Sequence, residues 1–446
     1  MKTIFITSFN PFILRNILET KVLPGISLNG NTRIVVFVPD YKKKFFIEKI
    51  KKENILIEGV EVQKISKQDI IFRYLNGSII NTKRLRIRHS EVFLKDRNIK
   101  NYIASVILGY LGYLPLIKKI IQFFDYKTIN KTKFKHYFDT YKPDLVFSTD
   151  IFHNDDVHFL AEARYRKIKT IGMVRSWDNI TNKGLFRVNP DKLIVHNDYI
   201  KKEVQRYQVF SNKNIFVSGI PQFDYYLKEY KPVDRVDYFK GIGLDPNNKT
   251  ILFAPHGERF HHTDWEILQF FKESLLQDIQ VIVRFPPNDV VNLNTFVPDS
   301  RFFIRQTGKG FLDRGPKDNE VEFSDTKSLA DDLYFSDVVI NYGSTISIDA
   351  AVFNKPVILV AFDGKEKLPY IKSVRRFFDY DHVKALVNYG FVEVVDSKKE
   401  LLSGIIFYLE NRKINENGRK KLIEDQVYKI DGLSCNRVAE YINKNL

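Results

Sequence analysis

The sequence predicts an α/β protein built from two Rossmann-like, doubly wound domains that face a cleft. Short apolar runs, typical of buried parallel strands, alternate with segments of helical periodicity, and this alternation stops and restarts once along the chain. A chain of 446 residues is also too long for one typical hydrophobic core. Two consecutive domains, each with its own parallel sheet, account for both observations.

The first series of apolar runs covers residues 1–8, 32–39, 144–149, 169–174, 192–195 and 214–217. Helical periodicity at 13–23 and 41–52 favours crossover connections within a parallel sheet. The sequence Gly-Ile-Pro-Gln-Phe-Asp at 219–224, followed by a stretch rich in Lys, Tyr and Asp to about 245, indicates a domain junction. We therefore expect an N-terminal domain of residues 1–222.

The second series covers residues 250–253, 281–283, 302–304, 338–340 and 357–360. It predicts a C-terminal domain of residues 223–425 with a parallel sheet of its own. The region from about 398 onward is helical in its periodicity. We expect its last segment, 426–446, to pack back on the N-terminal domain.

Composition limits the partners and the compartment. The chain has 70 Lys and Arg against 54 Asp and Glu, a formal charge of +16, which favours anionic partners. The basic residues are scattered among core aliphatics without a recognition motif, so we expect no nucleic acid. The single cysteine, Cys435, excludes an internal disulfide and a cysteine-cluster metal site, which suits a reducing cytoplasm. The apolar run at the N-terminus is too short for a signal peptide and is typical of a first strand.

Residues 101–124 interrupt the pattern with a strongly apolar, aromatic-rich stretch inside an expected helical insertion at about 83–135. One interpretation is a buried helical hairpin that closes the first domain. The other is an interfacial helix on anionic lipid, with Lys118 and Lys119 reaching phosphates and the basic residues at 83–88 on the same side. The second interpretation predicts a cytoplasmic protein that is peripheral on the inner face of the cell membrane.

The segment after the run 144–147 carries four candidate catalytic residues: Asp150, His153, Asp155 and Asp156. Carboxylates and a histidine at the carboxyl end of a strand can deprotonate an acceptor hydroxyl. The alternative is a helix N-terminus capped by acids, which explains Asp155 and Asp156 without catalysis. The sequence does not say which of the four is the base.

A second polar loop follows the run 169–174 and contains Arg175, Ser176, Trp177, Asp178 and Asn179. Because both loops follow strands of one parallel sheet, we expect them at the same edge of that sheet. Trp177 is a candidate stacking platform for a sugar ring, and Asp178 and Asn179 are candidates for its hydroxyls. Asn10, after the first strand, joins them as a candidate acceptor-binding residue.

In the second domain, the run 338–340 is followed by Tyr342, Gly343, Ser344 and Thr345, at the expected start of a helix. Helix N-termini bind phosphate through backbone N–H groups and capping hydroxyls. Asp349, one helical turn after Thr345, is placed to accept hydrogen bonds from ribose hydroxyls.

Basic residues and a glycine turn follow two other strands of this domain, and we expect them to hold a diphosphate. The candidates are His256, Gly257, Arg259 and Arg284. A zinc site of His256, His261 and His262 lacks a fourth ligand, so we expect no metal and no other cofactor. No P-loop and no complete Gly-x-Gly-x-x-Gly sequence occurs, which argues against ATPases and dehydrogenases.

These features resemble GT-B-fold transferases, in the superfamily that holds CDP-glycerol glycerophosphotransferases and bacterial surface-polysaccharide glycosyltransferases. The matching sequences are Gly-x-Pro-x-x-Asp at 219–224, Ala-Pro at 254–255, the stretch 341–349, and Asp-Gly-x-Ser at 431–434 followed by Arg437. The resemblance adds Gly219 and Pro221 to the expected donor-nucleotide site. It implies a nucleotide donor in the second domain and a glycan or lipid-linked acceptor in the first.

The resemblance leaves several reactions open. Glycerophosphotransferases carry His-Pro where this chain has Phe285-Pro286, which favours transfer of a sugar from a nucleotide-sugar donor to a growing surface glycan. The alternatives are a CDP-polyol-dependent glycerophosphotransferase or teichoic-acid-type polymerase, and a sugar-nucleotide 2-epimerase. A non-catalytic partner in polysaccharide assembly is a further alternative.

Overall fold

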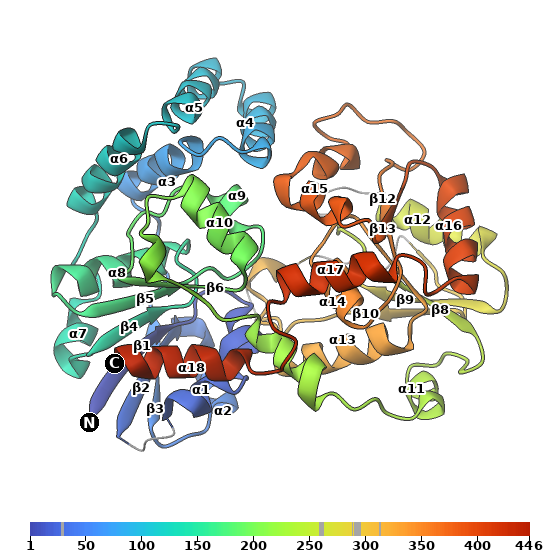
Figure 1. The fold of residues 1–446 in the computed structure, drawn as a ribbon, viewed down its shortest axis with the longest axis horizontal. Helices are drawn as coiled ribbons and strands as arrows, with labels where there is room; N and C mark the ends of the chain where they lie inside the picture. The colour runs from blue at the N-terminus through green and yellow to red at the C-terminus, as the bar shows by residue number, and fades with distance from the viewer. Residues whose placement is uncertain (28–30, 258–262, 288, 290–295, 312–313) are drawn as a thin grey trace. The chain divides into compact units, whose positions relative to one another are not determined.

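The computed structural model describes residues 1–27, 31–257, 263–287, 289, 296–311 and 314–446. It divides into two units, one of Met1–Asp224 with Val427–Leu446 and one of Tyr225–Gln426 (Figure 1). These limits lie within two residues of the boundaries expected at 222/223 and 425/426. Each unit contains its own parallel sheet, as the alternating pattern predicted.

The sheet of the first unit has seven parallel strands in the order β3-β2-β1-β4-β5-β6-β7. Their bounds are β1 Lys2–Thr7, β2 Thr32–Pro39, β3 Ile55–Val60, β4 Leu145–Ser148, β5 Lys169–Met173, β6 Lys192–Val195 and β7 Ile215–Val217. The order changes direction between β1 and β4, which pair through Ile4 and Leu145. A crevice at the carboxyl ends of two such strands is the usual ligand site of an open parallel sheet.

The α-helices of the first unit cover both faces of this sheet, except α3 to α6, which form an insertion. The α-helices are α1 Val22–Ser27, α2 Lys43–Lys49, α3 Lys67–Ser78, α4 Lys83–Asp96, α5 Ile99–Leu111, α6 Pro115–Thr128, α7 Lys135–Tyr141, α8 Asn154–Tyr165, α9 Asn179–Lys183, α10 Asp198–Tyr207 and α18 Ser434–Asn445. Side chains alternate along β1, so that Ile4 and Ile6 join a core with α1 and α18 while Phe5 packs on the aromatic rings of the opposite face. Phe5 meets Phe138 at a centroid distance of 5.1 Å.

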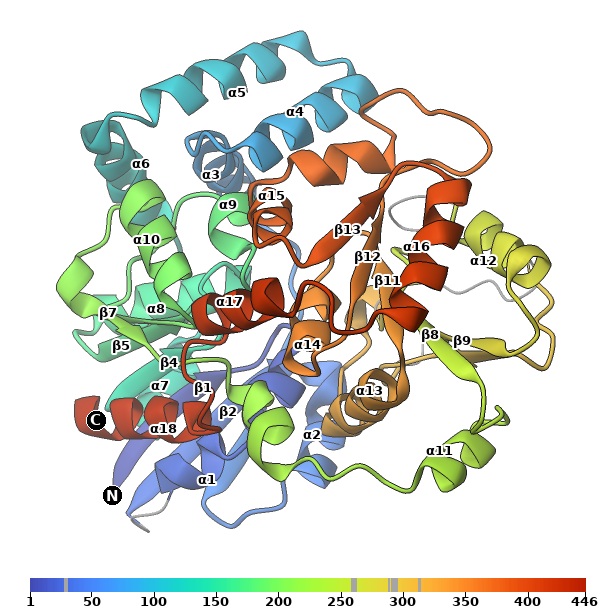
Figure 2. The same ribbon diagram turned by 45° about the vertical axis from the view of Figure 1, so that its right-hand side comes forward.

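Helix α18 returns to the first unit, where it packs against α1 (Figure 2). The carboxylate of Asp224 accepts the backbone N–H groups of Ser434 (2.9 Å) and Cys435 (2.7 Å), two of the donors that a helix N-terminus leaves unpaired. At its other end, Tyr441 stacks on Phe216 at 4.1 Å. The last segment is therefore part of the first unit, attached at both ends.

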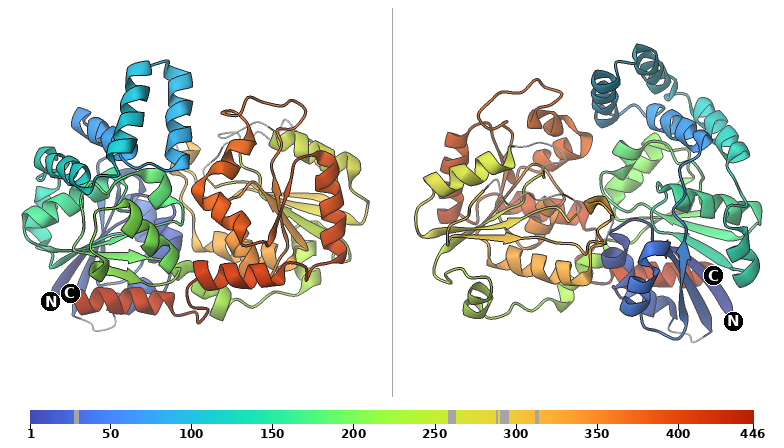
Figure 3. Two further views of the ribbon diagram at one scale, coloured as in Figure 1. Left: turned by 45° about the horizontal axis from the view of Figure 1, so that its top comes forward. Right: turned by 180° about the vertical axis from the view of Figure 1, so that it is seen from behind.

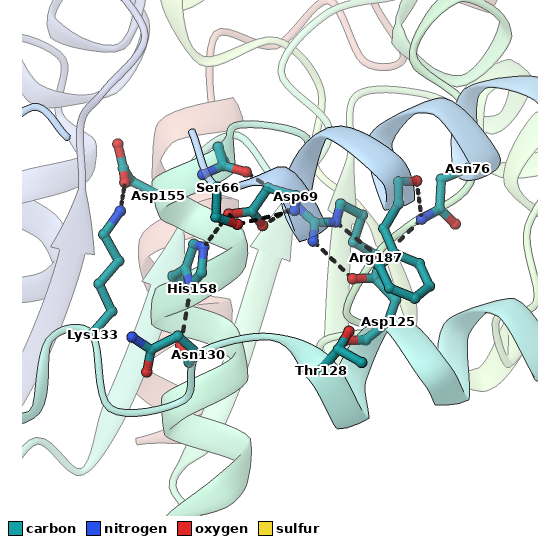
Figure 4. A network of polar contacts seen from close by, with 12 residues as sticks. Ser66, Asp69, Asn76, Asp125, Thr128, Asn130, Lys133, Asp155, His158 and Arg187 are labelled. Atoms are coloured by element: carbon teal, nitrogen blue, oxygen red, sulfur yellow. Dashed lines mark hydrogen bonds and ion pairs between the residues drawn. The ribbon is translucent and has the colours of Figure 1, made fainter. Parts of the chain in front are cut away.

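Helices α3 to α6 form an insertion that projects beyond the sheet of the first unit (Figure 3). A buried polar network ties it to the body of the unit (Figure 4). In this network, Arg187 pairs with Asp69 on α3 (2.9 Å) and with Asp125 on α6 (2.7 Å), and Asp69 also contacts His158 on α8 (3.3 Å). Within the described residues, no single helix is long and apolar enough to span a membrane, although α5 and α6 together, bent by 120°, pass the same test of length and composition.

The sheet of the second unit has six parallel strands in the order β10-β9-β8-β11-β12-β13. Their bounds are β8 Lys249–Phe253, β9 Ile279–Arg284, β10 Phe302–Arg305, β11 Val338–Asn341, β12 Val357–Val360 and β13 Val392–Val395. Its helices are α11 Arg235–Gly241, α12 Asp264–Ser274, α13 Phe323–Phe335, α14 Ile346–Val352, α15 Asp381–Asn388, α16 Lys398–Glu410 and α17 Glu416–Gln426. Here the order changes direction between β8 and β11, which pair through Phe253 and Ile340.

Candidate functional site

The candidate site of the first unit lies at the carboxyl ends of β1, β4 and β5, where three side chains predicted from separate loops meet. Oδ2 of Asp150 accepts hydrogen bonds from Nδ2 of Asn10 (3.2 Å) and from Nε of Arg175 (2.9 Å). Burial acts to raise the pKa of Asp150, but the charges of Arg175 and Lys183 and the hydrogen bond from Arg175 outweigh it, so this pKa is lowered. Asp150 is therefore an ionised carboxylate at neutral pH.

Asp156 supports this loop from inside the unit. Its Oδ1 accepts hydrogen bonds from the hydroxyls of Thr7 and Ser148 and from the backbone N–H of Asp150. Burial, and then the charge of Asp150, raise the pKa of Asp156 to about 8. The prediction of a catalytic role for Asp156 is wrong in this geometry, because the side chain has no exposed surface and is protonated at neutral pH.

His153 is the most exposed member of the cluster, with 33% of its side chain exposed against 22% for Asp155. Its ring stacks on Phe9 at 5.5 Å, and its Nδ1 accepts the backbone N–H of Asp155 (3.3 Å) as the cap of α8. Burial lowers the pKa of His153, so the ring is neutral at neutral pH. A neutral imidazole that accepts at Nδ1 carries its proton on Nε2. His153 therefore presents an N–H donor and not the base that the sequence suggested.

Asp155 lies in the first turn of α8 and forms an ion pair with Lys133 at 2.7 Å. The alternative interpretation of an acid at a helix N-terminus explains this position, because a negative charge there complements the helix dipole. The structure does not bring the Asp155 carboxylate into the hydrogen-bonded group around Asp150.

The loop after β5 divides its predicted residues between surface and interior. Arg175, Ser176 and Asp178 are partly exposed, whereas Trp177 (7%) and Asn179 (1%) are buried. Asn179 donates a hydrogen bond to the carboxylate of Asp178 over 3.1 Å. The prediction that Trp177 is an open stacking platform is wrong, since its ring belongs to the packing beneath the loop; Asn179 likewise shapes the loop from inside.

Two residues that interact electrostatically with the pair of Asp150 and Arg175 were missed. His196 directly follows β6, is 5% exposed, and has its pKa lowered to about 4, first by burial and then by the charge of Arg175. Lys183, at the end of α9, interacts electrostatically with Asp150, and its pKa is lowered mainly by burial. The signal for His196 was available, because it follows a strand as Asp150 and Arg175 do.

In the second unit, the turn between β11 and α14 is built by Asn341, the last residue of the strand. Its Oδ1 accepts the backbone N–H groups of Gly343 (2.8 Å) and Ser344 (2.9 Å), and its side chain also bonds the hydroxyl of Ser347. Gly343 has φ +85°, a conformation that favours glycine. Thr345 makes no side-chain cap bond. Thr345 is the N-cap residue of α14, as its predicted position requires, and the exposed hydroxyls of Ser344 and Thr345 do not cap the helix.

The loop after β8 lies beside that turn, because the two strands are neighbours and Ala254 N–H donates to Ile340 across 2.8 Å. Asp264, at the start of α12, accepts the backbone N–H groups of His256 (3.3 Å) and Gly257 (2.8 Å). Burial raises the pKa of Asp264 to about 7. The ring of His256 stacks on Tyr342 at 5.8 Å. The structure thus brings His256, Gly257 and the 342–345 turn together at one edge of the sheet.

Other residues of this unit that were predicted to bind the donor nucleotide are buried. Arg284 donates to Asp332 (2.8 Å) and to the hydroxyl of Ser328, both on α13, so the prediction that it binds a phosphate is wrong. Tyr342 is 2% exposed, and burial raises its pKa well above the ordinary value. Asp349 is 8% exposed, which leaves little of its carboxylate for a ribose.

Gly219 and Pro221, predicted in the donor site through the resemblance, instead belong to the attachment of α18. Gly219 has φ +86°, and a Cβ there would overlap the hydroxyl of Ser434. Pro221 is buried, and its carbonyl lies 3.3 Å from the sulfur of Cys435. Both residues close the first unit, so the prediction that they bind nucleotide is wrong. Arg259, His261 and His262 lie outside the described residues.

Curated relatives of this chain are bacterial polymer synthases. The teichoic acid ribitol-phosphate polymerase TarK of Staphylococcus aureus is 22% identical over 79% of this chain and 71% of its own. TarL of the same organism is 23% identical over 80% of this chain and 64% of its own. The teichoic acid poly(ribitol-phosphate) polymerase of Bacillus spizizenii is 24% identical over 43% of this chain, and the matched region spans only 29% of that longer protein.

Solved structures share the fold. The UDP co-structure of MnaA from S. aureus superposes with a TM-score of 0.56 at 11% identity, covering 99% of this chain and 96% of that chain. UDP-GlcNAc 2-epimerase from Neisseria meningitidis, bound to UDP-GlcNAc, gives 0.55 at 12% identity over the whole of both chains. Identities this low establish the two Rossmann-like domains of the GT-B class and nothing about the reaction.

The family itself is established by a match to a family model over more than half of the chain. The model of the family described as CDP-glycerol:poly(glycerophosphate) glycerophosphotransferase matches residues 168–444. This range begins at β5 of the first unit, contains the second unit entirely, and reaches α18. The chain therefore belongs to the CDP-glycerol:poly(glycerophosphate) glycerophosphotransferase family of transferases.

Proposed function

We propose that this chain transfers a polyol phosphate from a CDP-polyol to the hydroxyl end of a growing teichoic-acid-type polymer. The observation that carries the proposal is the family match over 168–444, which contains Arg175 and every loop of the second unit described above. Relatives named as ribitol-phosphate polymerases support the same reaction. These findings favour the alternative of the sequence analysis over transfer of a sugar from a nucleotide sugar.

The proposed reaction is a phosphoryl transfer. The acceptor oxygen forms a bond to the β-phosphorus of the CDP-polyol, and the bond from that phosphorus to the bridging oxygen breaks. CMP leaves with the bonding electrons, and the proton of the acceptor hydroxyl is taken up by a base. Because the transition state of such a transfer is loose, positioning and charge stabilisation supply most of the catalysis.

We assign acceptor binding to the first unit. His153 would donate its Nε2–H to the acceptor or to a phosphoryl oxygen, since it is the most exposed member of the cluster. Asp150 would accept the hydroxyl proton through the small part of it that is exposed, because it is 3% exposed and ionised, whereas Asp156 has no exposed surface and a raised pKa. Arg175 is a positioning residue that holds Asp150. Asn10, Ser176 and Asp178 would complete the polar lining.

We assign donor binding to the second unit. The exposed hydroxyls of Ser344 and Thr345, on the turn that Asn341 fixes, would bind the diphosphate. His256 and the backbone of Gly257 lie at the same edge of the sheet. No metal or other cofactor enters this proposal.

Transfer of a sugar remains a second candidate because of one position. Phe285 stands where glycerophosphotransferases carry a histidine, and it is buried against Trp265 at 5.4 Å. A buried phenyl ring can neither donate a hydrogen bond to a phosphate nor take up a proton. The two reactions differ in the nucleotide released, which is CMP from a CDP-polyol and a nucleoside diphosphate from most nucleotide sugars.

The test combines product analysis with a binding variant. CDP-glycerol, CDP-ribitol and UDP-sugars are incubated with the chain and a short polyol-phosphate primer, and released nucleotides are separated. We expect primer-dependent CMP. The double variant Ser344→Val/Thr345→Val should weaken CMP binding about tenfold, whereas Ser403→Val, an exposed hydroxyl on α16, should not. Release of UDP from a UDP-sugar without CMP from either CDP-polyol would overturn the proposal.

A further inference from the structure

The helical insertion of the first unit reaches the candidate site through two of its helices, α3 and α4. Helix α4 packs against α9, the short helix in the loop after β5. The expectation of a buried hairpin for residues 101–124, which lie in α5 and α6, is wrong, because large apolar side chains such as Ile103 and Phe123 are exposed. The part of the insertion that bears on the candidate site is therefore α3 and α4.

Close contacts hold α9 between these two helices. The hydroxyl of Thr82, the N-cap residue of α4, donates to the carbonyl of Thr181 over 2.7 Å. Directly after α9, the backbone N–H of Leu185 donates to the carbonyl of Asn76 on α3 over 2.8 Å. Gly184 has φ +100°, and a Cβ there would overlap the same carbonyl oxygen. The positions of α3, α4 and α9 are therefore fixed relative to one another.

Each of these three helices carries an exposed cation that acts on the cluster around Asp150. Lys183 on α9 interacts electrostatically with Asp150 and with Arg88 on α4. Arg88 interacts in turn with Arg73 on α3. Burial lowers the pKa of His153, and the charges of Lys183 and Arg73 lower it further. Arg73, Arg88 and Lys183 therefore form one cationic group beside Asp150 and His153.

The positive charge of this cationic group is not balanced among the residues that the structure describes, where its three side chains form no hydrogen bond and no ion pair. Asp150 is already paired with Arg175 at 2.9 Å. Glu91, which acts on the group from α4, is paired with Arg84 at 3.6 Å. Asp178 adds one further negative charge near Lys183. Since like charges held together repel one another, an anion bound among them would relieve that repulsion.

The chemistry of the cationic group favours a phosphate ester. Two of its three members are arginines, whose planar guanidinium donates parallel hydrogen bonds to two phosphate oxygens. A polyol-phosphate polymer carries one negative charge in each repeat and ends in a hydroxyl. When that hydroxyl lies at Asp150, the nearest phosphodiester is only a few covalent bonds away. It would therefore lie within reach of cations that act on Asp150 directly.

We propose that the cationic group of Arg73, Arg88 and Lys183 binds the phosphodiester nearest to the hydroxyl end of the acceptor, so that the chain selects a polyanionic acceptor over a neutral glycan. This inference rests on the proposed function and deepens it, because it names the residues that recognise the acceptor. The donor diphosphate, assigned above to the second unit, is the other source of the same chemistry, and the experiment separates the two.

The experiment is titration calorimetry of the full chain with a glycerol-phosphate hexamer, in the absence of a donor, and separately with CDP. The variant Arg73→Gln/Arg88→Gln should lower the affinity for the hexamer about tenfold or more, because hydrogen bonds to charged groups are lost, and should leave the affinity for CDP unchanged. Binding of the hexamer should weaken as salt is raised, and an oligoglycerol without phosphates should not compete with it.

The control variant is Lys67→Gln/Arg86→Gln, which removes two exposed charges from the same two helices. Arg86 lies two residues from Arg88 and therefore on a different face of α4. This variant should keep the affinity for the hexamer. An equal loss in both variants would show attraction to the overall charge of the chain and would overturn the proposal. A loss of CDP affinity in Arg73→Gln/Arg88→Gln, with hexamer affinity unchanged, would assign the group to the donor and would also overturn it.

Hexamer binding and CMP release are separate measurements, so the two proposals can fail separately. If the wild type releases CMP but its affinity for the hexamer is the same as that of Arg73→Gln/Arg88→Gln, the acceptor site is overturned and the reaction stands. If the wild type binds the hexamer, the variant does not, and no CMP is released from either CDP-polyol, the phosphate site stands and the reaction is overturned.

Discussion

Arg175 donates a hydrogen bond from Nε to Oδ2 of Asp150 across 2.9 Å, and this pair joins the loops that follow β4 and β5. The charge of Arg175 is the strongest of the influences that keep the pKa of Asp150 low against its burial. The same charge helps to keep His196 neutral. Arg175 thus sets the charge state of the cluster at the carboxyl ends of these strands.

Arg175→Gln should move the acidic limb of the pH–rate profile upward. Loss of the guanidinium charge raises the pKa of Asp150, so the carboxylate becomes protonated at a higher pH and activity is lost sooner on acidification. The measurement is the rate of CMP release against pH. Arg166→Gln, which removes the ion pairs of Arg166 with Asp139 and Glu162 at the end of α8, is the control and should leave the limb in place. If the acidic limb of the pH–rate profile does not shift in Arg175→Gln, Asp150 is not the base of the reaction.

The role of Nε2 of His153 can be tested with two substitutions, one that places a nitrogen near the position of Nε2 and one that does not. Because Nδ1 accepts the Asp155 N–H, the account assigns the donor to Nε2. The amide nitrogen of glutamine lies near the position of Nε2, so His153→Gln should retain activity within about tenfold, while His153→Ala should lose about a hundredfold. Equal, severe losses in both variants would mean that His153 takes up a proton instead. Steady-state rates of CMP release decide between the two.

The raised pKa of Asp156 predicts that the free energy of unfolding depends on pH. The folded-state pKa of about 8 lies above the ordinary value of about 3.9, so the folded protein binds a proton that the unfolded chain releases. This contribution is complete below pH 4 and is lost as pH rises toward 8, by about 1.4 kcal/mol per pH unit. Asp156→Asn should remove that decline, so the difference in melting temperature between variant and wild type should change between pH 5 and 8. If the melting temperatures of the variant and the wild type follow parallel curves against pH, the raised pKa of Asp156 would be contradicted.

Asn341 should control donor binding although its side chain is buried. Asn341→Ala would leave the N–H groups of Gly343 and Ser344 without their acceptor, at a cost of about 1–3 kcal/mol, and the turn that presents Ser344 would change. We expect CMP affinity to fall about tenfold in titration calorimetry. Asn341→Asp keeps the acceptor oxygens and should bind more tightly than Asn341→Ala. The reverse order would show that the turn does not hold the donor phosphates.

Much of the fold was predictable because parallel strands buried on both faces leave continuous apolar runs. The run at 32–39 corresponds to β2, and the runs at 338–340 and 357–360 lie within β11 and β12. The segment at 13–23 was less well predicted, since it forms a short π-helical segment, Leu14–Leu18, followed by α1. Strand β3, at the edge of the sheet, was missed because its apolar run of Ile55, Leu56 and Ile57 is short and is followed by Glu58 and Gly59.

The candidate site was predictable in its loops and not in the orientation of its side chains. Topology alone brings Asn10, Asp150 and Arg175 together, because each follows a neighbouring or nearby strand. The burial of Trp177 depends on what packs beneath the loop, and Arg284 turns toward α13 because Asp332 lies there. The order of residues along the chain predicts neither the burial of Trp177 nor the ion pair between Arg284 and Asp332. The resemblance likewise found the 219–224 sequence and did not reveal that Asp224 holds α18.

The central claim is that this chain moves a polyol phosphate and releases CMP. The most direct measurement is the nucleotide released when the purified chain, a CDP-polyol and a polyol-phosphate primer are combined, with the phosphate gained by the primer counted in parallel. The account predicts one CMP for each polyol phosphate added, no CMP without primer, and none from Asp150→Asn. Release of a nucleoside diphosphate from a nucleotide sugar, with no CMP from either CDP-glycerol or CDP-ribitol, would contradict it.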